Sequence, residues 1–112
     1  LLNLQEFMET EKLKIEKLKV TFEKELSKFQ NWSLLGIGGY FAYIGYNSTL
    51  DSTSMSKKLL ADQSILTIPG DMFFPKSKNL FIKERRSIRI AFANSTDKEI
   101  IEFFKRLKIF NL

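Results

Sequence analysis

A single charged side chain stands inside an apolar run near the C-terminal end of the sequence. Arg89 lies in residues 87–92, which read Ser-Ile-Arg-Ile-Ala-Phe and have the β-branched and aromatic character of a strand. Side chains on a strand alternate faces, so Arg89 shares a face with Ser87 and Ala91. A guanidinium among small side chains is well placed to bind a carboxylate or phosphate through two hydrogen bonds. The residues alone leave a second interpretation open, in which Arg89 lies at a sheet edge and reaches solvent or pairs with Glu84.

The composition excludes several other kinds of chemistry. The 112 residues contain neither Cys nor His, which excludes disulfides, thiol catalysis and most zinc or haem ligation. The formal net charge is +5, but lysines alternate with acidic residues and no continuous basic stripe forms. No aromatic stacking motif for RNA is present either, so we expect neither nucleic-acid binding nor a metal site.

The N-terminal part of the chain predicts a long helix, near residues 3 to 29. This stretch is dense in Glu, Lys and Leu and lacks Gly and Pro. Apolar residues recur within it at helical spacing, at Leu4, Met8, Ile15, Leu18, Phe22, Leu26 and Phe29. Glu11 falls where an apolar residue would continue the stripe. We therefore expect a helix that packs one face against a sheet or another chain, in preference to a coiled coil.

The rest of the chain alternates between strand and helix signals. Residues 31–35 are expected to interrupt the helix, and a strand is expected at 36–46. A short helix that Thr53 or Ser54 caps should follow and end at Asp62. Strands are expected at 65–68 and 87–94, and Thr96 with Glu99 forms a capping box that begins the last helix. The expected fold class is α+β, a long N-terminal helix followed by a small sheet of about three strands covered by helices.

One uncharged span tests whether the chain enters a membrane. No charged residue occurs between Lys28 and Asp51, which is long enough for a bilayer crossing. Four glycines and several Asn, Ser and Thr residues interrupt the span, so a loop, a buried strand and another loop are the better interpretation. The N-terminus does not resemble a signal peptide. We expect no membrane partner and a cytoplasmic location.

Four short motifs in this order resemble a known family. They are Gly38-Gly39-Tyr40-Phe41 with Trp32 before it, Pro69-Gly70 with Phe73, Ile88-Arg89-Ile90-Ala91-Phe92-Ala93, and Phe104-Lys105-Arg106-Leu107. Together they are similar to the C-terminal small domain of the fold-type I pyridoxal-phosphate aminotransferases, the aspartate and aromatic aminotransferase group. Asp71 and Phe74 depart from that pattern, where Ser and Gly are commoner.

The resemblance implies a role for Arg89 and a cofactor for the parent enzyme. In the family, the arginine of this strand binds the substrate α-carboxylate, and Arg89 occupies its motif position. The implied substrates are an amino acid and a 2-oxo acid, and the implied cofactor is pyridoxal phosphate. Ser54-Met55-Ser56-Lys57 copies the segment around the family's Schiff-base lysine, but the Gly-x-Arg-x-Gly segment that should follow is missing and the order is wrong. We expect no catalytic lysine, no cofactor bound by this chain alone and no activity of its own.

These implications set the expected organisation. We expect residues 1–112 to be one aminotransferase-like C-terminal domain, with residues 1–30 as a long connecting helix and 31–112 as the small domain. Its expected partners are the substrate and either a complementing chain that carries the cofactor or further copies of itself. The alternative is a non-catalytic interaction or oligomerisation domain, in which the long helix and the Phe-rich faces bind another protein.

Overall fold

The computed structural model describes residues 3–38, 40–70 and 86–110. Within them the elements are, in chain order, α1 (Leu4–Leu26), β1 (Trp32–Ile37), β2 (Phe41–Tyr46), α2 (Ser52–Gln63), β3 (Ile68–Pro69), β4 (Ser87–Ala91) and α5 (Asp97–Ile109). The α+β class with a long N-terminal helix is confirmed. Asp71, Phe73, Phe74 and Glu84 lie outside the described residues.

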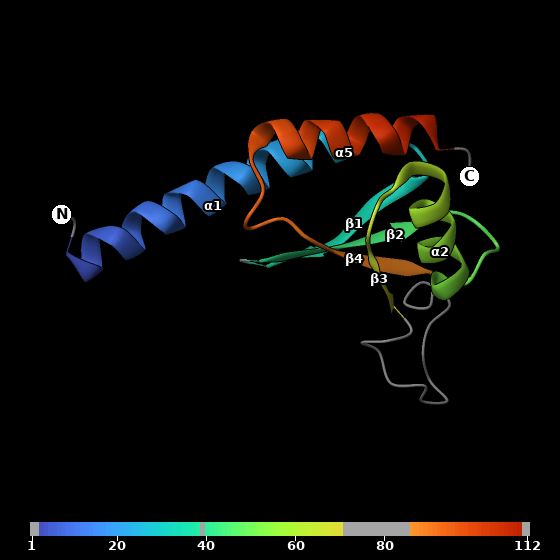
Figure 1. Cartoon of the computed structure of the whole chain (residues 1–112), viewed down its shortest axis with the longest axis horizontal. Helices are drawn as coiled ribbons and strands as arrows, with labels where there is room; N and C mark the ends of the chain where they lie inside the picture. The colour runs from blue at the N-terminus through green and yellow to red at the C-terminus, as the bar shows by residue number, and fades with distance from the viewer. Residues whose placement is uncertain (1–2, 39, 71–85, 111–112) are drawn as a thin grey trace.

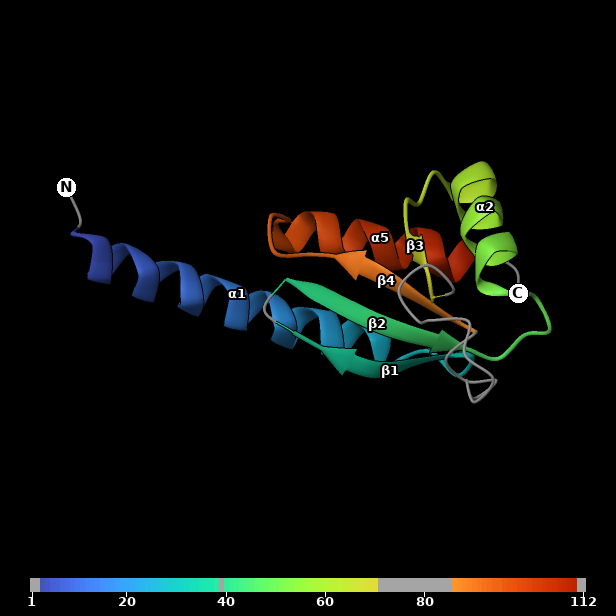
Figure 2. The ribbon, with the colours of Figure 1, turned by 90° about the horizontal axis from the view of Figure 1, so that it is seen from below.

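The strands form one antiparallel sheet in the order β1-β2-β4-β3. Figure 1 shows α1 and α5 together over one face of this sheet, with α2 at the end near β3. Figure 2, seen from below, shows the opposite face, which these two helices leave uncovered. The sheet therefore has one face that belongs to the core and another that α1 and α5 do not cover.

Aromatic packing joins the two helices to the sheet. The Phe22 ring of α1 lies with its centroid 5.7 Å from that of Phe92 and 4.9 Å from that of Phe104 in α5. Ile44 on β2 and Ile88 on β4 are fully buried beneath them. Burying side chains of this size typically contributes about 1.5–3 kcal/mol each, so this layer is the main source of the fold's stability.

Side chains at the helix N-termini accept the backbone N–H groups that would otherwise lack partners. The Thr96 hydroxyl accepts from the Glu99 N–H, and the Glu99 carboxylate accepts from the Thr96 N–H, which confirms the predicted capping box. For α2 the predicted cap, Thr53 or Ser54, was two or three residues late. Asp51 caps this helix, because its carboxylate accepts the Ser54 N–H at 2.7 Å.

The sheet has four strands where about three were expected, because the break at 31–35 was wrong. Residues 32–37 form β1, and Trp32 is buried. The predicted 36–46 strand is instead divided between the end of β1 and β2, and the Gly38 N–H donates to the Phe41 carbonyl at 2.8 Å between them. The predicted strands at 65–68 and 87–94 are also shorter in the structure, where they are β3 and β4.

The uncharged span between Lys28 and Asp51 holds the two strands β1 and β2, whereas the sequence predicted one buried strand between two loops. No helix in the described part of the chain is both long enough and apolar enough to cross a membrane.

Candidate substrate-binding face

Arg89 lies in the interior of the sheet. Its strand, β4, pairs with β2 on one side and β3 on the other, and the residues opposite Arg89 are Tyr43 and Ile68. The alternative position at a sheet edge is therefore wrong. Strands on both sides fix the backbone of Arg89, so its side chain starts from a rigid base.

The guanidinium of Arg89 stacks on an aromatic ring of the neighbouring strand. Its Cζ atom lies 4.4 Å from the centroid of the Phe41 ring, and the residue is partly buried. Phe41 pairs with Ala91, two residues from Arg89, so the contact runs diagonally across the two strands. The Nε atom of Arg89 is buried. Contact through the flat face of a guanidinium leaves its edge in one plane, and that edge is the part that can bind a carboxylate through two bonds.

Small residues occupy the positions beside Arg89, as the sequence indicated. Ser87 and Gly45 are a buried cross-strand pair on the same face as Arg89. A Cβ atom at Gly45 would lie only 3.1 Å from the nearest Leu35 side-chain atom. Leu35 therefore closes one end of this face, and a side chain at position 45 would have to displace it.

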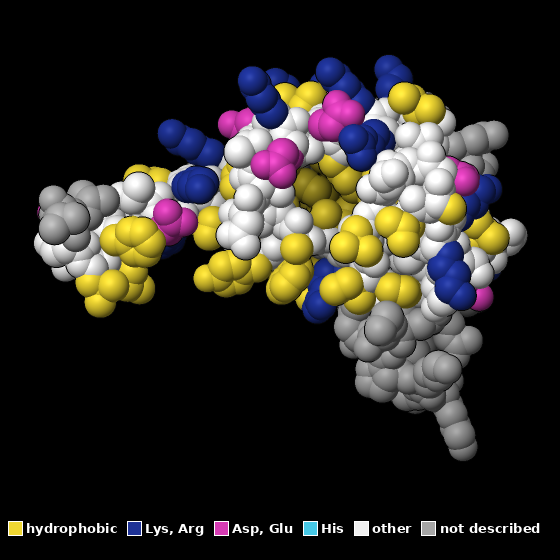
Figure 3. Space-filling view, in the orientation of Figure 1, with side chains coloured by type: hydrophobic (Ala, Val, Ile, Leu, Met, Phe, Trp, Pro, Cys, Tyr) yellow, Lys and Arg dark blue, Asp and Glu magenta, His cyan; other side chains and the backbone are white. Residues whose placement is uncertain are grey.

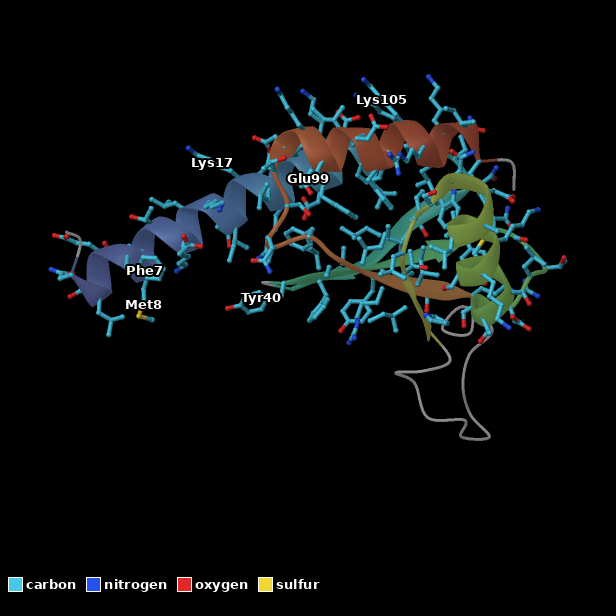
Figure 4. All side chains as sticks on the ribbon, viewed as in Figure 1. Phe7, Met8, Lys17, Tyr40, Glu99 and Lys105 are labelled. Carbon is cyan, nitrogen blue, oxygen red and sulfur yellow. The ribbon has the colours of Figure 1, made fainter. Side chains whose placement is uncertain are left out.

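The opposite end of the face opens into a hollow of about 390 Å³ beside Phe41 and Ala91. Its walls include Tyr40 from the turn and Glu99 from the first turn of α5. Figure 4 shows both labelled side chains at this end of the sheet, with Tyr40 well below α1. Tyr40 is 65% exposed, so the phenol borders this opening from the solvent side.

Lys57, the lysine that the sequence compared with the family's Schiff-base residue, does not lie in an enclosed site. Lys57 lies on the exposed side of α2, while Met55 and Leu59 of the same helix are fully buried. A Schiff-base lysine needs an enclosing site for the pyridine ring and the phosphate, and an exposed helix position does not offer one. The described residues also contain no group of Asp and Glu side chains arranged to hold a metal ion.

A second hollow, of about 600 Å³, lies between α5, the end of β4 and residues 64–66. Phe92 and Ile100 contribute to its apolar floor, and the space-filling view shows the depression below α5 (Figure 3). Arg106 at its rim pairs with Glu102 at 3.2 Å and donates to the Gln63 carbonyl at 3.5 Å. The sequence motifs did not indicate this hollow, because residues far apart in the chain form it.

The outer half of α1 lies outside the packed part of the helix. We expected one face to pack against a sheet or another chain, and packing within this chain begins only near Ile15. Toward the N-terminus, Leu4 is 75% exposed, Phe7 52% and Met8 61%. Figure 1 shows this half of α1 extending beyond the sheet, and Figure 3 shows hydrophobic side chains along its lower side.

Comparison with known proteins identifies one sequence family. The family described as aminotransferase class I and II matches residues 2–107. A search of curated protein sequences finds no match.

Solved structures with a similar fold are also known. A PLP-dependent aminotransferase from Streptococcus suis superimposes with a TM-score of 0.75 at 15% identity, over 94% of this chain and 26% of its own. YbdL from Escherichia coli, described with a methionine aminotransferase function, has a TM-score of 0.69 at 21% identity, over 86% of this chain and 24% of its own. A NifS-like protein from Rickettsia africae has a TM-score of 0.67 at 20% identity, over 87% and 28%. The chain thus spans about a quarter of the length of these proteins.

Proposed function

The chain belongs to the class I and II aminotransferases, and from that premise we propose that it is the C-terminal part of a pyridoxal-phosphate-dependent aminotransferase. Such an enzyme transfers an amino group between an amino acid and a 2-oxo acid. Two of the structures with a similar fold support this assignment, since both are described as aminotransferases. A cytoplasmic location stays a prediction.

We assign the substrate α-carboxylate to Arg89. This role rests on the position of Arg89. The residue lies on an interior strand and is partly buried, and its Cζ atom is 4.4 Å from the Phe41 ring centroid. Charge-assisted hydrogen bonds to such a group contribute roughly 1.5–3 kcal/mol each. Two such bonds are consistent with a dissociation constant of about a millimolar, or roughly −4 kcal/mol, for the isolated chain.

The rest of the active site belongs to another part of the parent enzyme. The cofactor, when bound there, supplies the electron sink for amino-group transfer. This chain contributes binding and orientation of the substrate carboxylate, and the exposed Lys57 takes no part. We therefore expect the chain alone to be inactive, in keeping with its span of about a quarter of the structures it matches.

Two measurements test this proposal. Calorimetric titration with pyruvate should show binding that is absent with pyruvamide, whose amide carries no charge. The substitution Arg89→Lys keeps the charge but removes the two-pronged geometry, and should weaken pyruvate binding by roughly tenfold or more. Equal binding of pyruvate by the variant would contradict the role of Arg89.

The second measurement concerns the cofactor. The chain mixed with pyridoxal phosphate should develop no imine absorbance band stronger than the one that free lysine gives with pyridoxal phosphate. A band that one lysine substitution in this chain abolishes would show that the chain carries its own Schiff-base lysine and would contradict the proposal.

A second candidate function is a non-catalytic interaction domain. The exposed apolar side chains on the outer half of α1 favour it, because large apolar residues grouped on one surface commonly mark a binding site. This function and the substrate role of Arg89 use different surfaces, so they do not exclude each other.

A further inference from the structure

The outer sides of α1 and α5 repeat one pattern. In each helix a lysine is followed after three residues by an aliphatic residue, and after four more residues by a second lysine. The two rows are Lys17, Val20, Lys24 and Lys28 in α1, and Lys98, Ile101, Lys105 and Lys108 in α5. Intervals of three and four residues place each row on one side of its helix. We call the two rows together the lysine face.

The two rows belong to one surface of the molecule. The Thr21 hydroxyl of α1 donates to the Asp97 carboxylate at the start of α5 at 3.0 Å, which joins the two helices. Figure 4 shows Lys17 and Lys105 both pointing away from the sheet. Lys and Arg side chains follow this upper side of the molecule in the space-filling view (Figure 3). Every residue of the lysine face is exposed, so the whole surface is open to a partner.

Most of this positive charge is not neutralised within the chain. The rows themselves contain no Asp or Glu. Of the ion pairs among the described residues, only the one between Lys28 and Glu25 uses a lysine of this face. Glu102, next to Ile101 in the sequence, pairs with Arg106 instead. The sequence showed no basic stripe because acidic residues alternate with the lysines along the chain, and the helical turn places those acids on other sides.

Exposed aliphatic side chains lie within the charged rows. Val20 is 65% exposed and Ile101 39%, each with lysines on both sides along its helix. Aliphatic side chains beside lysines suit a lipid surface, where they enter the boundary between headgroups and acyl chains. The rows contain no Arg and no aromatic residue, the side chains that bind phosphate through two bonds and stack on bases. The combination therefore favours lipid over nucleic acid.

We propose that the lysine face binds the surface of a membrane rich in anionic lipid, with α1 and α5 lying along the bilayer. The lysines contact the anionic headgroups, and Val20 and Ile101 enter the layer beneath them. The expectation of no membrane partner considered a crossing span and the order of charges along the chain, and this contact needs neither. It also does not depend on the aminotransferase function or on Arg89.

Co-sedimentation of the 112-residue chain with lipid vesicles tests this contact. Vesicles of phosphatidylcholine with about 30% phosphatidylserine should bind the chain, and vesicles of phosphatidylcholine alone should not. Raising the salt concentration from about 0.1 M to about 0.5 M should weaken the binding at least tenfold, because salt screens exposed charges.

Paired substitutions identify the surface that is responsible. A lysine near an anionic membrane strengthens binding by roughly fivefold, so Lys24→Glu with Lys105→Glu should weaken it by about a hundredfold or more. Lys12→Glu with Lys57→Glu is the matched control, because both lysines are exposed and lie outside the lysine face. The control changes the net charge equally and should bind within about fivefold of wild type.

The aliphatic part has its own test. Val20→Ser with Ile101→Ser should weaken vesicle binding by about fivefold or more without changing its salt dependence, because no charge is altered. Circular dichroism of each variant confirms that the helices are intact. The proposal would be overturned by a wild type that does not bind phosphatidylserine vesicles, by equal binding of the two lysine variants, or by a serine variant that binds like wild type. Tighter binding to a DNA oligonucleotide than to these vesicles at the same salt concentration would assign the face to nucleic acid and overturn it too.

Discussion

The two faces of the sheet are built from the same strands but have different chemistry. On one face, Ile44, Ile88 and Phe92 are almost fully buried under α1 and α5. On the other, Arg89 stacks on Phe41 beside a hollow that opens to solvent. Alternation along β2 and β4 produces both faces, so one strand pair both stabilises the fold and presents a binding group. Changes on the first face should therefore affect stability, and changes on the second should affect binding.

The largest expected effect comes from the core face. Phe22→Ala removes a ring that contacts Phe92 and Phe104, and should lower the free energy of unfolding by about 3–5 kcal/mol. Leu13→Ala on the same helix is the matched control, because Leu13 is 64% exposed and should cost less than about 0.5 kcal/mol. Urea denaturation followed by circular dichroism measures both. Equal losses would show that α1 does not pack as described.

On the opposite face, a substitution should affect binding more than it affects stability. Arg89→Gln should abolish pyruvate binding while lowering the free energy of unfolding by no more than about 2 kcal/mol, because the lost contact is the cation–π interaction of a partly buried guanidinium with Phe41. Calorimetry measures the first quantity and urea denaturation the second. A variant that unfolds as readily as Phe22→Ala would make Arg89 a structural residue and remove the contrast between the faces.

A smaller effect is expected where α5 begins. Thr96→Ala removes the hydroxyl that accepts the Glu99 N–H and should cost about 1 kcal/mol. Thr49→Ala, at an exposed loop position, is the control and should leave stability within about 0.5 kcal/mol. Thermal unfolding of both variants gives the comparison. If both variants unfold at the same temperature, the Thr96 cap does not contribute to the layer that covers the core face.

The smallest effect concerns pH. The backbone N–H of Ser54 donates to Asp51, and this bond, with the Ser54 hydroxyl and the charge of Lys57, lowers the pKa of the carboxyl group. A lowered folded-state pKa means that the carboxylate contributes stability above its ordinary pKa, near 4, and that this contribution is lost as pH falls through the folded value. Asp51→Asn keeps a cap acceptor but should reduce the acid sensitivity of unfolding. If the stability of wild type and of Asp51→Asn depended on pH in the same way at low pH, the role of the Asp51 charge would be contradicted.

Local signals predicted some of this architecture and non-local contacts decided the rest. Thr96 and Glu99 are three residues apart, so their capping box could be predicted from the sequence alone. The Phe41 ring lies 48 positions before Arg89, and only the register of β2 on β4 brings them together. The sequence could therefore indicate that Arg89 binds an anion but not what supports its side chain.

The same limit applies to α1 and to the turn before β2. Apolar spacing predicted the face of α1 but not where the sheet beneath it ends, and so it missed the exposure of Leu4 and Met8. Gly38-Gly39 reads equally as part of a family motif and as a turn. The turn became clear only from the bond between Gly38 and Phe41, which separates β1 from β2.

Nitrogen NMR of the Arg89 Nε–H group tests the central claim most directly, because this buried group belongs to the guanidinium that is proposed to bind the carboxylate. Titration with pyruvate should shift this signal in a saturable way, with a dissociation constant of about a millimolar. Pyruvamide at the same concentrations should leave it in place. A signal that is unmoved by pyruvate, or that moves equally with both compounds, would contradict the assignment of Arg89 as the carboxylate-binding residue.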